Sequence, residues 1–340
     1  IRRPPRSTRK ESSAASDVYK RQAYDLCEAD AKRFAPVFNS IEHLMVRAPE
    51  ILGNHYDISY QGKQLKTARN LKRLPLDTHY RESNAHFGQY FGWERPLYFG
   101  KTSEPKLRFD KPDWFDHVGE EVRTTHKNVS IFDNSSFGKI EVKGPDAESF
   151  LLKVCAGNMD REPGRVIYSA VLNQRGTFES DITAHRIAKD HYRLFVGTTS
   201  IQRDLVWLAN TAEGYNITIE DSTSKYAVLA VMGPNSPKIL NNCGASTLIE
   251  LDYFSTGSSY IAGKHIRAAR MSYVSEFGWE ITCRSENASA IYSALITEGG
   301  RPAGIWAQTS MRIEKGYLSL IHISEPTRRR GISYAVFCLK

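Results

Sequence analysis

The chain has 340 residues, of which 41% are hydrophobic and 25% charged, so it can bury a sizeable core in one or two domains. Its net charge of +8 comes from its ends. Residues 1–22 carry seven basic and two acidic side chains and residues 318–340 carry four and one, whereas residues 23–317 are balanced at 35 each. A basic balance confined to the ends gives no support for a nucleic-acid or membrane partner, and we exclude both.

Both ends resemble translated sequencing-adapter read-through, on the strings at residues 12–22, 322–327 and 332–340. The alternative for the first end is an arginine-rich mitochondrial leader, but the amphipathic leucine pattern of such a leader is missing. We therefore expect residues 1–22 and 318–340 to be artefact tails. The remaining body, residues 23–317, is expected to be an internal fragment of a longer protein.

Residues 23–101 are typical of a connector module and not of a core. A helical pattern at residues 40–47 is followed by a strand-like pattern at 55–60 and by a polar, basic stretch. The segment closes with residues 91–99, Phe-Gly-Trp-Glu-Arg-Pro-Leu-Tyr-Phe. Taken alone, the Trp-Glu-Arg-Pro string predicts an aromatic corner with an ion pair ahead of a proline break.

From residue 111 onward, one pattern of elements occurs twice. Residues 139–143 alternate like a strand, run into Gly144 and Pro145, and continue at helical spacing over 146–154. The same order of strand, Gly-Pro turn and helix returns at residues 227–240, with the two turns 89 positions apart. The repetition predicts two copies of one structural unit.

Each copy continues with hairpin-like strands and then a strand that leads into a helix. The two final steps are residues 192–196 into 202–208, and residues 279–283 into 288–296. Thr199 and Gln202 have capping-box spacing, which favours a helix start at Thr199. We predict an α+β fold of duplicated split βαβ units, with helices packed on antiparallel sheets.

Two carboxylates stand out inside this repeated body. Asp181 in segment 175–182 and Glu280 in segment 272–281 each lie near a glycine within a strand-like, largely apolar run. A buried charge there is costly unless it meets a partner or a ligand. Because the acids belong to different copies, a cleft between the copies would hold both. The alternative is that each forms a structural ion pair with a local arginine such as Arg186 or Arg270.

Segments 175–182 and 272–281 together resemble the tetrahydrofolate-binding domain of the aminomethyltransferase family, whose Gly-Gly-x-x-Ser-Asp hairpin and Gly-Glu-x-Gly-aromatic-Glu turn line a pterin pocket. Residues 68–75 and 91–99 resemble the central module that joins the flavin domain to the folate domain in sarcosine and dimethylglycine dehydrogenases. The resemblance implies a partial connector over residues 23–101 and a C-terminally truncated folate-binding domain over residues 102–317.

The resemblance also implies roles for individual residues. Glu280 would accept two hydrogen bonds from the ring N–H and the exocyclic amine of a pterin. Tyr168 and Trp279, which are close in sequence to the two acids, would supply aromatic faces. Asp181 would be the catalytic residue and would stabilise positive charge at the folate nitrogens that carry the one-carbon unit. Arg312 matches a family arginine at the end of the folate domain; its alternative role is a salt bridge with Glu314.

Three positions depart from the family pattern: Thr177 replaces a glycine, Ser275 replaces a glycine, and Asn134 replaces a hydrophobic residue after Asp133. A lost glycine strains a turn wherever positive φ is required. We therefore expect these departures to weaken folate binding, although both acids are retained.

The cysteines of the body, Cys27, Cys155, Cys243 and Cys283, are widely spaced and form no CxxC pair. This favours a reducing compartment and argues against zinc and disulfides. The body has no HExxH or P-loop string and no apolar run of the ~18 residues that a membrane span needs. We expect a soluble, metal-free protein.

The function implied is part of a flavin-dependent N-methyl amine dehydrogenase, in which this region binds tetrahydrofolate and captures the one-carbon unit. FAD would belong to a part of the parent protein outside this chain, so the fragment alone is expected to be inactive. Its partners would be folate and an N-methyl amine, in the mitochondrial matrix or the bacterial cytoplasm. The alternatives are a glycine cleavage aminomethyltransferase, a regulatory subunit of pyruvate dehydrogenase phosphatase, and a folate-binding module without chemistry.

Overall fold

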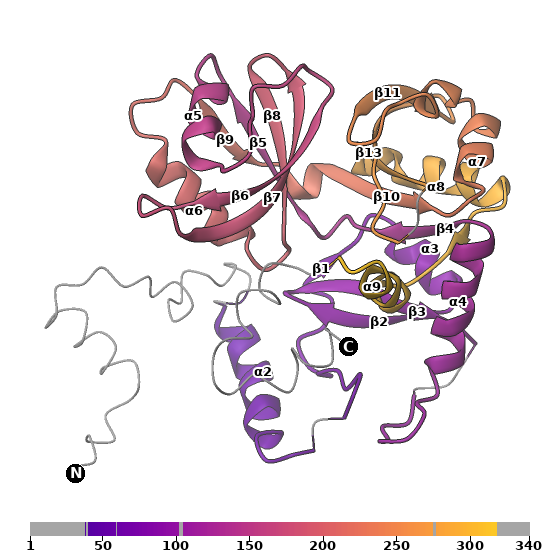
Figure 1. Ribbon diagram of the computed structural model, residues 1–340. Coiled ribbons are helices and arrows are strands. Elements are labelled where there is room, and N and C mark those ends of the chain that lie inside the picture. The colour runs from indigo at the N-terminus through magenta and orange to yellow at the C-terminus, as the bar shows by residue number, and fades with distance from the viewer. Residues whose placement is uncertain (1–37, 39, 59, 102–104, 275–276, 318–340) are drawn as a thin grey trace, which may run out of the picture.

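The computed structural model describes residue 38 and residues 40–58, 60–101, 105–274 and 277–317 (Figure 1). Both expected artefact tails and Ser275 lie outside these residues. Three bodies are visible in Figure 1: two sheet-containing lobes side by side at the top, and an N-terminal module below them. None of the helices in this described part of the chain is both long and apolar enough to cross a bilayer.

The N-terminal module consists of two helices and a small sheet. Its elements are α2 (Ile41–Gly53), β1 (Lys72–Arg73), α3 (Asp77–Glu82), β2 (Ala85–Tyr90) and β3 (Trp93–Phe99). The three strands form a sheet in the order β1-β3-β2. Buried side chains of this module, among them Leu76, Tyr80 and Trp93, belong to the hydrophobic core of the second lobe. The module is therefore packed onto that lobe and is not a free-standing domain.

The first lobe is a five-stranded sheet in the order β6-β7-β8-β5-β9. Its elements in chain order are β5 (Gly138–Lys143), α5 (Ala147–Val154), β6 (Val166–Leu172), β7 (Phe178–Ala188), β8 (His191–Val196), α6 (Ile201–Thr211) and β9 (Thr218–Asp221). The apolar side chains of α5 and α6, such as Phe150 and Leu208, are buried with those of the strands in one core.

The second lobe repeats this order with one strand added: β11-β12-β13-β10-β4-β14. Its elements are β4 (Ser130–Asp133), η3 (Thr223–Lys225), β10 (Tyr226–Met232), α7 (Ser236–Asn242), η4 (Ser246–Leu248), β11 (Thr256–Ile261), β12 (Lys264–Arg270), β13 (Gly278–Arg284), η5 (Ser285–Asn287), α8 (Ala288–Thr297) and β14 (Arg301–Pro302). Helices α4 (Phe115–Lys127) and α9 (Ile305–Glu314) flank it. The α+β class and the duplicated unit are confirmed.

The strand β4 connects the two lobes. It pairs antiparallel with β10 of the second lobe, through Ala230 opposite Phe132 and Leu229 opposite Asp133. Four residues, 134–137, separate the end of β4 from the start of β5 in the first lobe. A second backbone connection joins β6 to the start of β11, where the N–H of Val166 donates to Phe254 (2.9 Å). The two copies are thus tied together at two places.

Two local predictions were wrong. Residues 55–57, expected in a strand, form turns in which His55 N–H donates to Leu52 (3.2 Å) and Asp57 N–H to Asn54 (3.1 Å). These turns follow directly from the end of α2 and leave no neighbouring strand to pair with. Helix α6 begins one residue later than the Thr199 capping box predicts, because Ser200 is its N-cap and turns its hydroxyl toward the Gly197 carbonyl (3.1 Å).

The two Gly-Pro turns have the same physical cause in both copies. Gly144 and Gly233 have φ of 139° and 133°, which L-residues with side chains rarely adopt. A backbone oxygen also occupies the place of the missing side chain. A Cβ on Gly144 would lie 2.2 Å from the Asn216 oxygen, and a Cβ on Gly233 would lie 2.3 Å from the Asn128 oxygen. Each glycine permits a close backbone approach at the end of a central strand.

Substituting either turn glycine should therefore be severe. We expect Gly144→Ala and Gly233→Ala each to lower the free energy of unfolding by roughly 3 kcal/mol, because strain and overlap with backbone add together. The control is Gly263→Ala, where φ is 68° but no atom lies within 4 Å of the new Cβ, and about 1 kcal/mol is expected. Urea unfolding measures all three. Similar losses in all three variants would contradict the role of the close approach.

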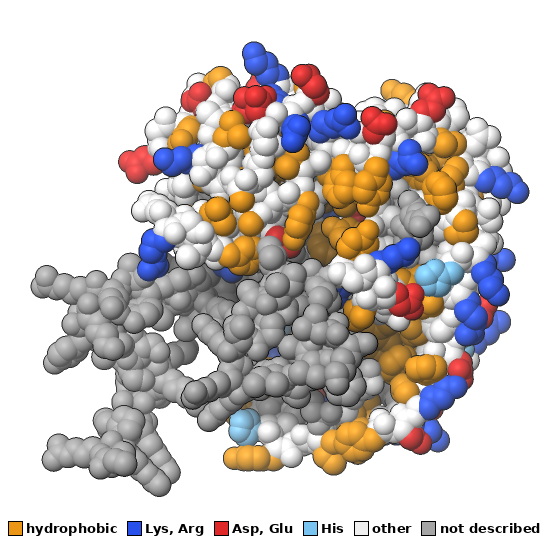
Figure 2. Space-filling model, in the orientation of Figure 1, with side chains coloured by type: hydrophobic (Ala, Val, Ile, Leu, Met, Phe, Trp, Pro, Cys, Tyr) orange, Lys and Arg blue, Asp and Glu red, His pale blue; other side chains and the backbone are white. Residues whose placement is uncertain are grey.

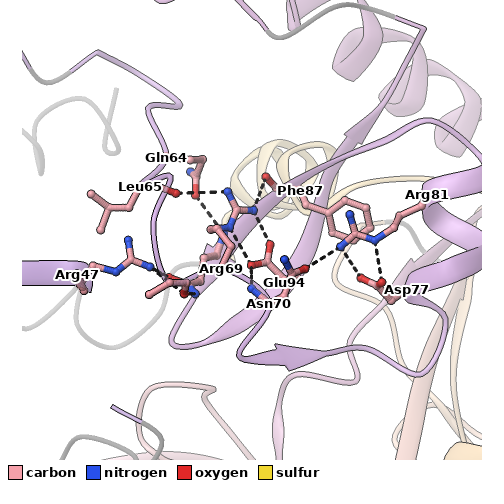
Figure 3. Close-up of polar contacts among 11 residues, drawn as sticks. Arg47, Gln64, Leu65, Arg69, Asn70, Asp77, Arg81, Phe87 and Glu94 are labelled. Carbon is pink, nitrogen blue, oxygen red and sulfur yellow. Dashed lines mark hydrogen bonds and ion pairs between the residues drawn. The ribbon is translucent and has the colours of Figure 1, made fainter. Parts of the chain in front are cut away.

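A buried ion pair between Arg69 and Glu94 joins segments 68–75 and 91–99 of the N-terminal module (Figure 3). Arg69 Nε donates to Glu94 Oε1 (2.8 Å), and its Nη2 donates to Oε2. The backbone N–H of Asn70 adds a third bond to Glu94 (2.8 Å), and Arg69 also donates to the Phe87 carbonyl (3.2 Å). The Glu94 side chain is only 1% exposed. Its pKa is lowered, since these hydrogen bonds outweigh the effect of burial.

Removing the arginine should leave a buried carboxylate almost unpaired. Arg69→Ala is expected to cost about 3 kcal/mol of unfolding free energy. The exposed pair of Lys225 and Glu220 provides the control, and Lys225→Ala should change the free energy of unfolding little, because solvent screens this pair. Urea denaturation at neutral pH compares the two variants. If Arg69→Ala is as mild as Lys225→Ala, water solvates Glu94 and the pair does not anchor the module.

Candidate functional site

The two candidate acids come from the two lobes but not from corresponding strands. Asp181 lies in β7, the second strand of the first sheet, and Glu280 lies in β13, the third strand of the second sheet. Neither carboxylate forms an ion pair with a lysine or arginine among the described residues. Arg186 instead pairs with Glu148 and Asp160, and Arg270 donates to the Leu251 carbonyl. The alternative of structural ion pairs with these two arginines is therefore wrong.

Glu280 is a buried carboxylate with few hydrogen-bond donors. Its exposure is 8%, and one oxygen accepts a hydrogen bond from Asn134 Nδ2 (3.0 Å). Burial raises its pKa to about 7, and the Asn134 bond opposes this effect. An ionised carboxylate can accept about four hydrogen bonds, so most of the acceptor capacity of Glu280 is unused by the described residues.

Asp181 is bound by the tyrosine that the sequence analysis placed beside it. Tyr168 on the neighbouring strand β6 donates its hydroxyl to Asp181 Oδ2 (3.0 Å). The phenol of Tyr168 is half exposed, and its pKa is raised to about 12 by burial and by the charge of Asp181. Tyr168 thus orients Asp181 and presents an aromatic face to the surroundings.

Tyr273 links the two acids, and sequence reasoning missed it. Burial and then the negative charge of Glu280 raise its pKa well above the usual range, and the charges of Tyr168 and Asp181 act in the same direction. Its ring also meets that of Tyr317 edge-on, with centroids 6.1 Å apart. The available signal was its position in segment 272–281, which also carries Glu280.

The surface around the junction is richer in apolar side chains than the rims of the lobes. Figure 2 shows hydrophobic side chains gathered between the two upper lobes, whereas lysines, arginines and acids are spread along the outer edges. Exposed aromatic residues of the site region include Tyr168, Tyr253 and Tyr317, at 51%, 46% and 44% exposure. Flat ring systems bind well on such faces.

The structure does not bring Trp279 to this site. Its indole is fully buried in the core of the second lobe, and its Nε1–H donates to the Leu248 carbonyl (2.8 Å). Successive side chains of a strand point to opposite faces. Because Trp279 directly precedes Glu280 in β13, it faces away from the acid by necessity.

Arg312 is likewise separated from the two acids. It lies in the last turn of α9 and donates to the Tyr317 carbonyl, five residues further on. The expected salt bridge with Glu314 is not formed, because Glu314 contacts His126 Nε2 instead (3.0 Å). Arg312 approaches the site only through Tyr317, which packs on Tyr273.

The replacement of a glycine by Thr177 does not strain its hairpin. Positive φ falls on Gly176 (72°), and Thr177 is not among the residues with positive φ. Asn173 Oδ1 accepts the N–H of Thr177 (3.1 Å), which closes the turn. The expected strain at Thr177 is therefore absent, while Ser275 lies outside the described residues.

Comparison with known protein families shows the family to which this chain belongs. Residues 76–327 match the GCVT N-terminal domain, and residues 21–73 match the FAD dependent oxidoreductase central domain. The chain belongs to the GCVT domain family. The family resemblance stated from sequence is thereby confirmed, and the GCVT match covers both repeated lobes.

Relatives of this GCVT domain protein include oxidoreductases of methylated amines. The 4-methylaminobutanoate oxidase (formaldehyde-forming) of Paenarthrobacter nicotinovorans is 30% identical over 313 residues, covering 88% of this chain and 37% of the relative. The mitochondrial dimethylglycine dehydrogenase of Rattus norvegicus is 28% identical over 305 residues, covering 86% and 35%. The chain thus spans just over a third of the length of either relative.

A solved structure supports the fold of the GCVT domain directly. The glycine cleavage system aminomethyltransferase T from Bartonella henselae matches with a TM-score of 0.63 and 25% identity. The match covers 73% of this chain and 64% of that one.

A groove of the GCVT domain protein lies elsewhere. A hollow of about 550 Å³ runs beside α4 and β14, and its lining includes Glu121, Lys127 and Arg301 but none of Asp181, Glu280, Tyr168 and Tyr273. Glu121 accepts hydrogen bonds from Phe99 N–H (2.7 Å) and Gly304 N–H (2.9 Å), and burial raises its pKa to about 7. It thereby ties β3 to the start of α9.

The raised pKa of Glu280 predicts a pH-dependent stability. In the folded protein, Glu280 keeps its proton up to about pH 7. In the unfolded chain, a glutamate carboxyl with the ordinary pKa of 4.5 releases its proton at lower pH. Stability is therefore lost as the pH rises from about 4.5 to 7, by roughly 3 kcal/mol. Glu280→Gln should remove this loss and be more stable than the parent at pH 8 but not at pH 4.5.

Thermal unfolding at half-unit steps of pH measures the stability of Glu280→Gln and of the parent protein. The effect of Glu280 is the difference in stability between the two at each pH. This difference removes contributions that both proteins share, such as that of Glu121. Glu250→Gln on the surface is the control and should give a difference that is flat with pH. A flat difference for Glu280→Gln would mean that Glu280 is ionised throughout this range.

Proposed function

We propose that this chain is the folate-binding part of a flavin-dependent N-methyl amine oxidoreductase of the sarcosine and dimethylglycine dehydrogenase type. Its task in that enzyme is to capture the released one-carbon unit on tetrahydrofolate. The observation that carries the proposal is the pair of acids from two lobes, free of lysine and arginine partners in the described structure and sharing Tyr273 as a neighbour.

The residues present fit the pterin ring of a folate. A pterin offers a ring N–H beside an exocyclic amine, and a carboxylate can accept both hydrogen bonds. Glu280 is buried and has unused acceptor capacity. The amide oxygen of Asn134 beside it is also buried and has no hydrogen-bond partner among the described residues. Buried polar atoms of native proteins rarely lack partners, so a ligand that donates hydrogen bonds accounts for both.

Asp181 has the chemistry for the carbon-transfer end of the ligand. Formaldehyde is the product named for the Paenarthrobacter relative. Its capture by tetrahydrofolate forms two C–N bonds and releases one water molecule, and positive charge develops on nitrogen during the loss of water. A carboxylate held by Tyr168 at 3.0 Å stabilises that charge and can take up the nitrogen proton.

Oxidation of the amine is assigned to the rest of the parent protein. FAD supplies the hydride acceptor when it is bound, and no described residue of this chain is proposed to hold it. Residues 23–101 are proposed as part of the connecting module and residues 102–317 as the folate-binding domain. The compartment that we propose depends on the source organism. It is the mitochondrial matrix in a eukaryote, in line with the word mitochondrial in the name of the rat relative, and the cytoplasm in a bacterium.

The second candidate is an aminomethyltransferase of the glycine cleavage system, which the Bartonella structure supports. The match of residues 21–73 to the central domain of FAD dependent oxidoreductases favours the oxidoreductase instead. A regulatory phosphatase subunit is not favoured, since buried acids with open acceptor capacity have no use in a protein that acts only through protein partners.

Calorimetric titration with 5-formyltetrahydrofolate, a stable reduced folate, tests the proposal. One saturable site per chain is expected. Glu280→Gln keeps the shape but loses the charged acceptor, and should weaken binding by 10-fold or more, as expected for loss of a charge-assisted hydrogen bond. Glu250→Gln should bind like the parent. Absence of binding by the folded parent protein would overturn the proposal.

A further inference from the structure

Asn134 occupies an unusual place in this site. The family pattern has a hydrophobic residue after Asp133, and this chain has an amide there that is 3% exposed. Its Nδ2 donates to Glu280 Oε1 at 3.0 Å, whereas its Oδ1 has no hydrogen-bond partner in the described part of the chain. An acceptor left without a partner in a buried position destabilises the fold. A hydrophobic side chain would avoid this cost.

The orientation of the amide follows from its chemistry. When Glu280 is ionised, its carboxylate only accepts hydrogen bonds, so the NH₂ end of Asn134 faces Glu280. The carbonyl end is therefore the open one. Since both ends belong to one rigid amide, the open oxygen is an acceptor fixed beside the Glu280 carboxylate.

The backbone around Asn134 is held on both sides. Its N–H donates to the Val228 carbonyl (2.9 Å), and the N–H of Val228 donates to Ser135 Oγ (2.9 Å). Asp133 is fixed by the hydroxyl of Tyr80 (2.8 Å) and the N–H of Ser135 (2.8 Å). These bonds fix the position of the amide before any ligand arrives, which is the condition for selective binding.

The register of the sheet places Asn134 near Glu280. Ala230 of β10 is opposite Phe132 on one side and opposite Glu280 on the other. Asn134 follows Phe132 by two residues and therefore continues on the same face. The short link between β4 and β5 thus delivers this amide to the acid of the other copy.

We propose that Asn134 determines the specificity of this site, by adding a second fixed acceptor beside Glu280. The two acceptors together select ligands with adjacent N–H donors, as on the 2-amino-4-oxopyrimidine edge of a reduced pterin. The inference rests on the proposed folate function and deepens it. Hydrogen-bonding sites reject analogues that lack the matching donor more strongly than apolar pockets reject a change of size.

The test combines two proteins with two ligands. The proteins are the parent and Asn134→Leu, which keeps the volume but removes both polar ends. The ligands are 5-formyltetrahydrofolate and the same folate with its 2-amino group replaced by methyl. At a pH high enough to ionise Glu280 in both proteins, Asn134→Leu should weaken binding of the first ligand by 10-fold or more. It should bind the second ligand within about 2-fold of the parent, since only the first ligand offers a 2-amino donor to the Asn134 oxygen.

A second readout separates direct recognition from support of the fold. Asn134 donates to Glu280 and so favours its ionised form, which is the form that accepts from the ligand. In Asn134→Leu, the pH above which 5-formyltetrahydrofolate binds should therefore move upward. Asn134→Leu must also keep the circular dichroism of the parent. Ser149→Leu, on an exposed part of α5 in the other lobe, is the control and should change neither the affinity nor the pH profile.

The outcomes are distinct. A parent protein that binds neither ligand overturns the folate function and this inference together. A parent that binds the first ligand, with an Asn134→Leu variant that loses affinity equally for both ligands or for neither, overturns the role of Asn134 and leaves the folate function intact. Selective loss for the ligand with the 2-amino group supports it.

Discussion

The pairing of β4 with β10 is the constraint on which the rest of the structure depends. A strand that precedes the first copy in sequence is built into the sheet of the second copy, and the chain turns back into the first within a few residues. This exchange holds the two lobes together and sets the position of Asp133 and Asn134. Without it, the acid of β13 would lie beside a sheet edge and not beside an amide.

The architecture was predictable because it repeats. Two Gly-Pro turns 89 positions apart, each between a strand and a helix, suffice to show the duplication, and the structure explains them by backbone atoms in the place of a Cβ. The acids were predictable for a different reason, since a charge in an apolar strand needs a partner or a ligand.

Other features could not be predicted because they depend on which face of a strand a residue occupies or on distant partners. Trp279 was expected at the site for its closeness in sequence to Glu280, yet adjacent residues of a strand face apart. Asn134 was expected to weaken folate binding. Its partner Glu280 lies 146 positions away in the sequence, so their hydrogen bond could not be predicted. The strand-like pattern at residues 55–60 failed because a strand needs a neighbour, which periodicity alone does not supply.

The ion pair of Arg69 and Glu94 has a mechanical consequence. The two family matches divide the chain between residues 73 and 76, but this pair bridges the division, and Tyr80 carries the connection on to Asp133 beside Asn134. The boundary between the two family matches is therefore crossed by side-chain contacts as well as by the backbone. Through these contacts, a shift of the connector would act on Asp133 and on the neighbouring Asn134.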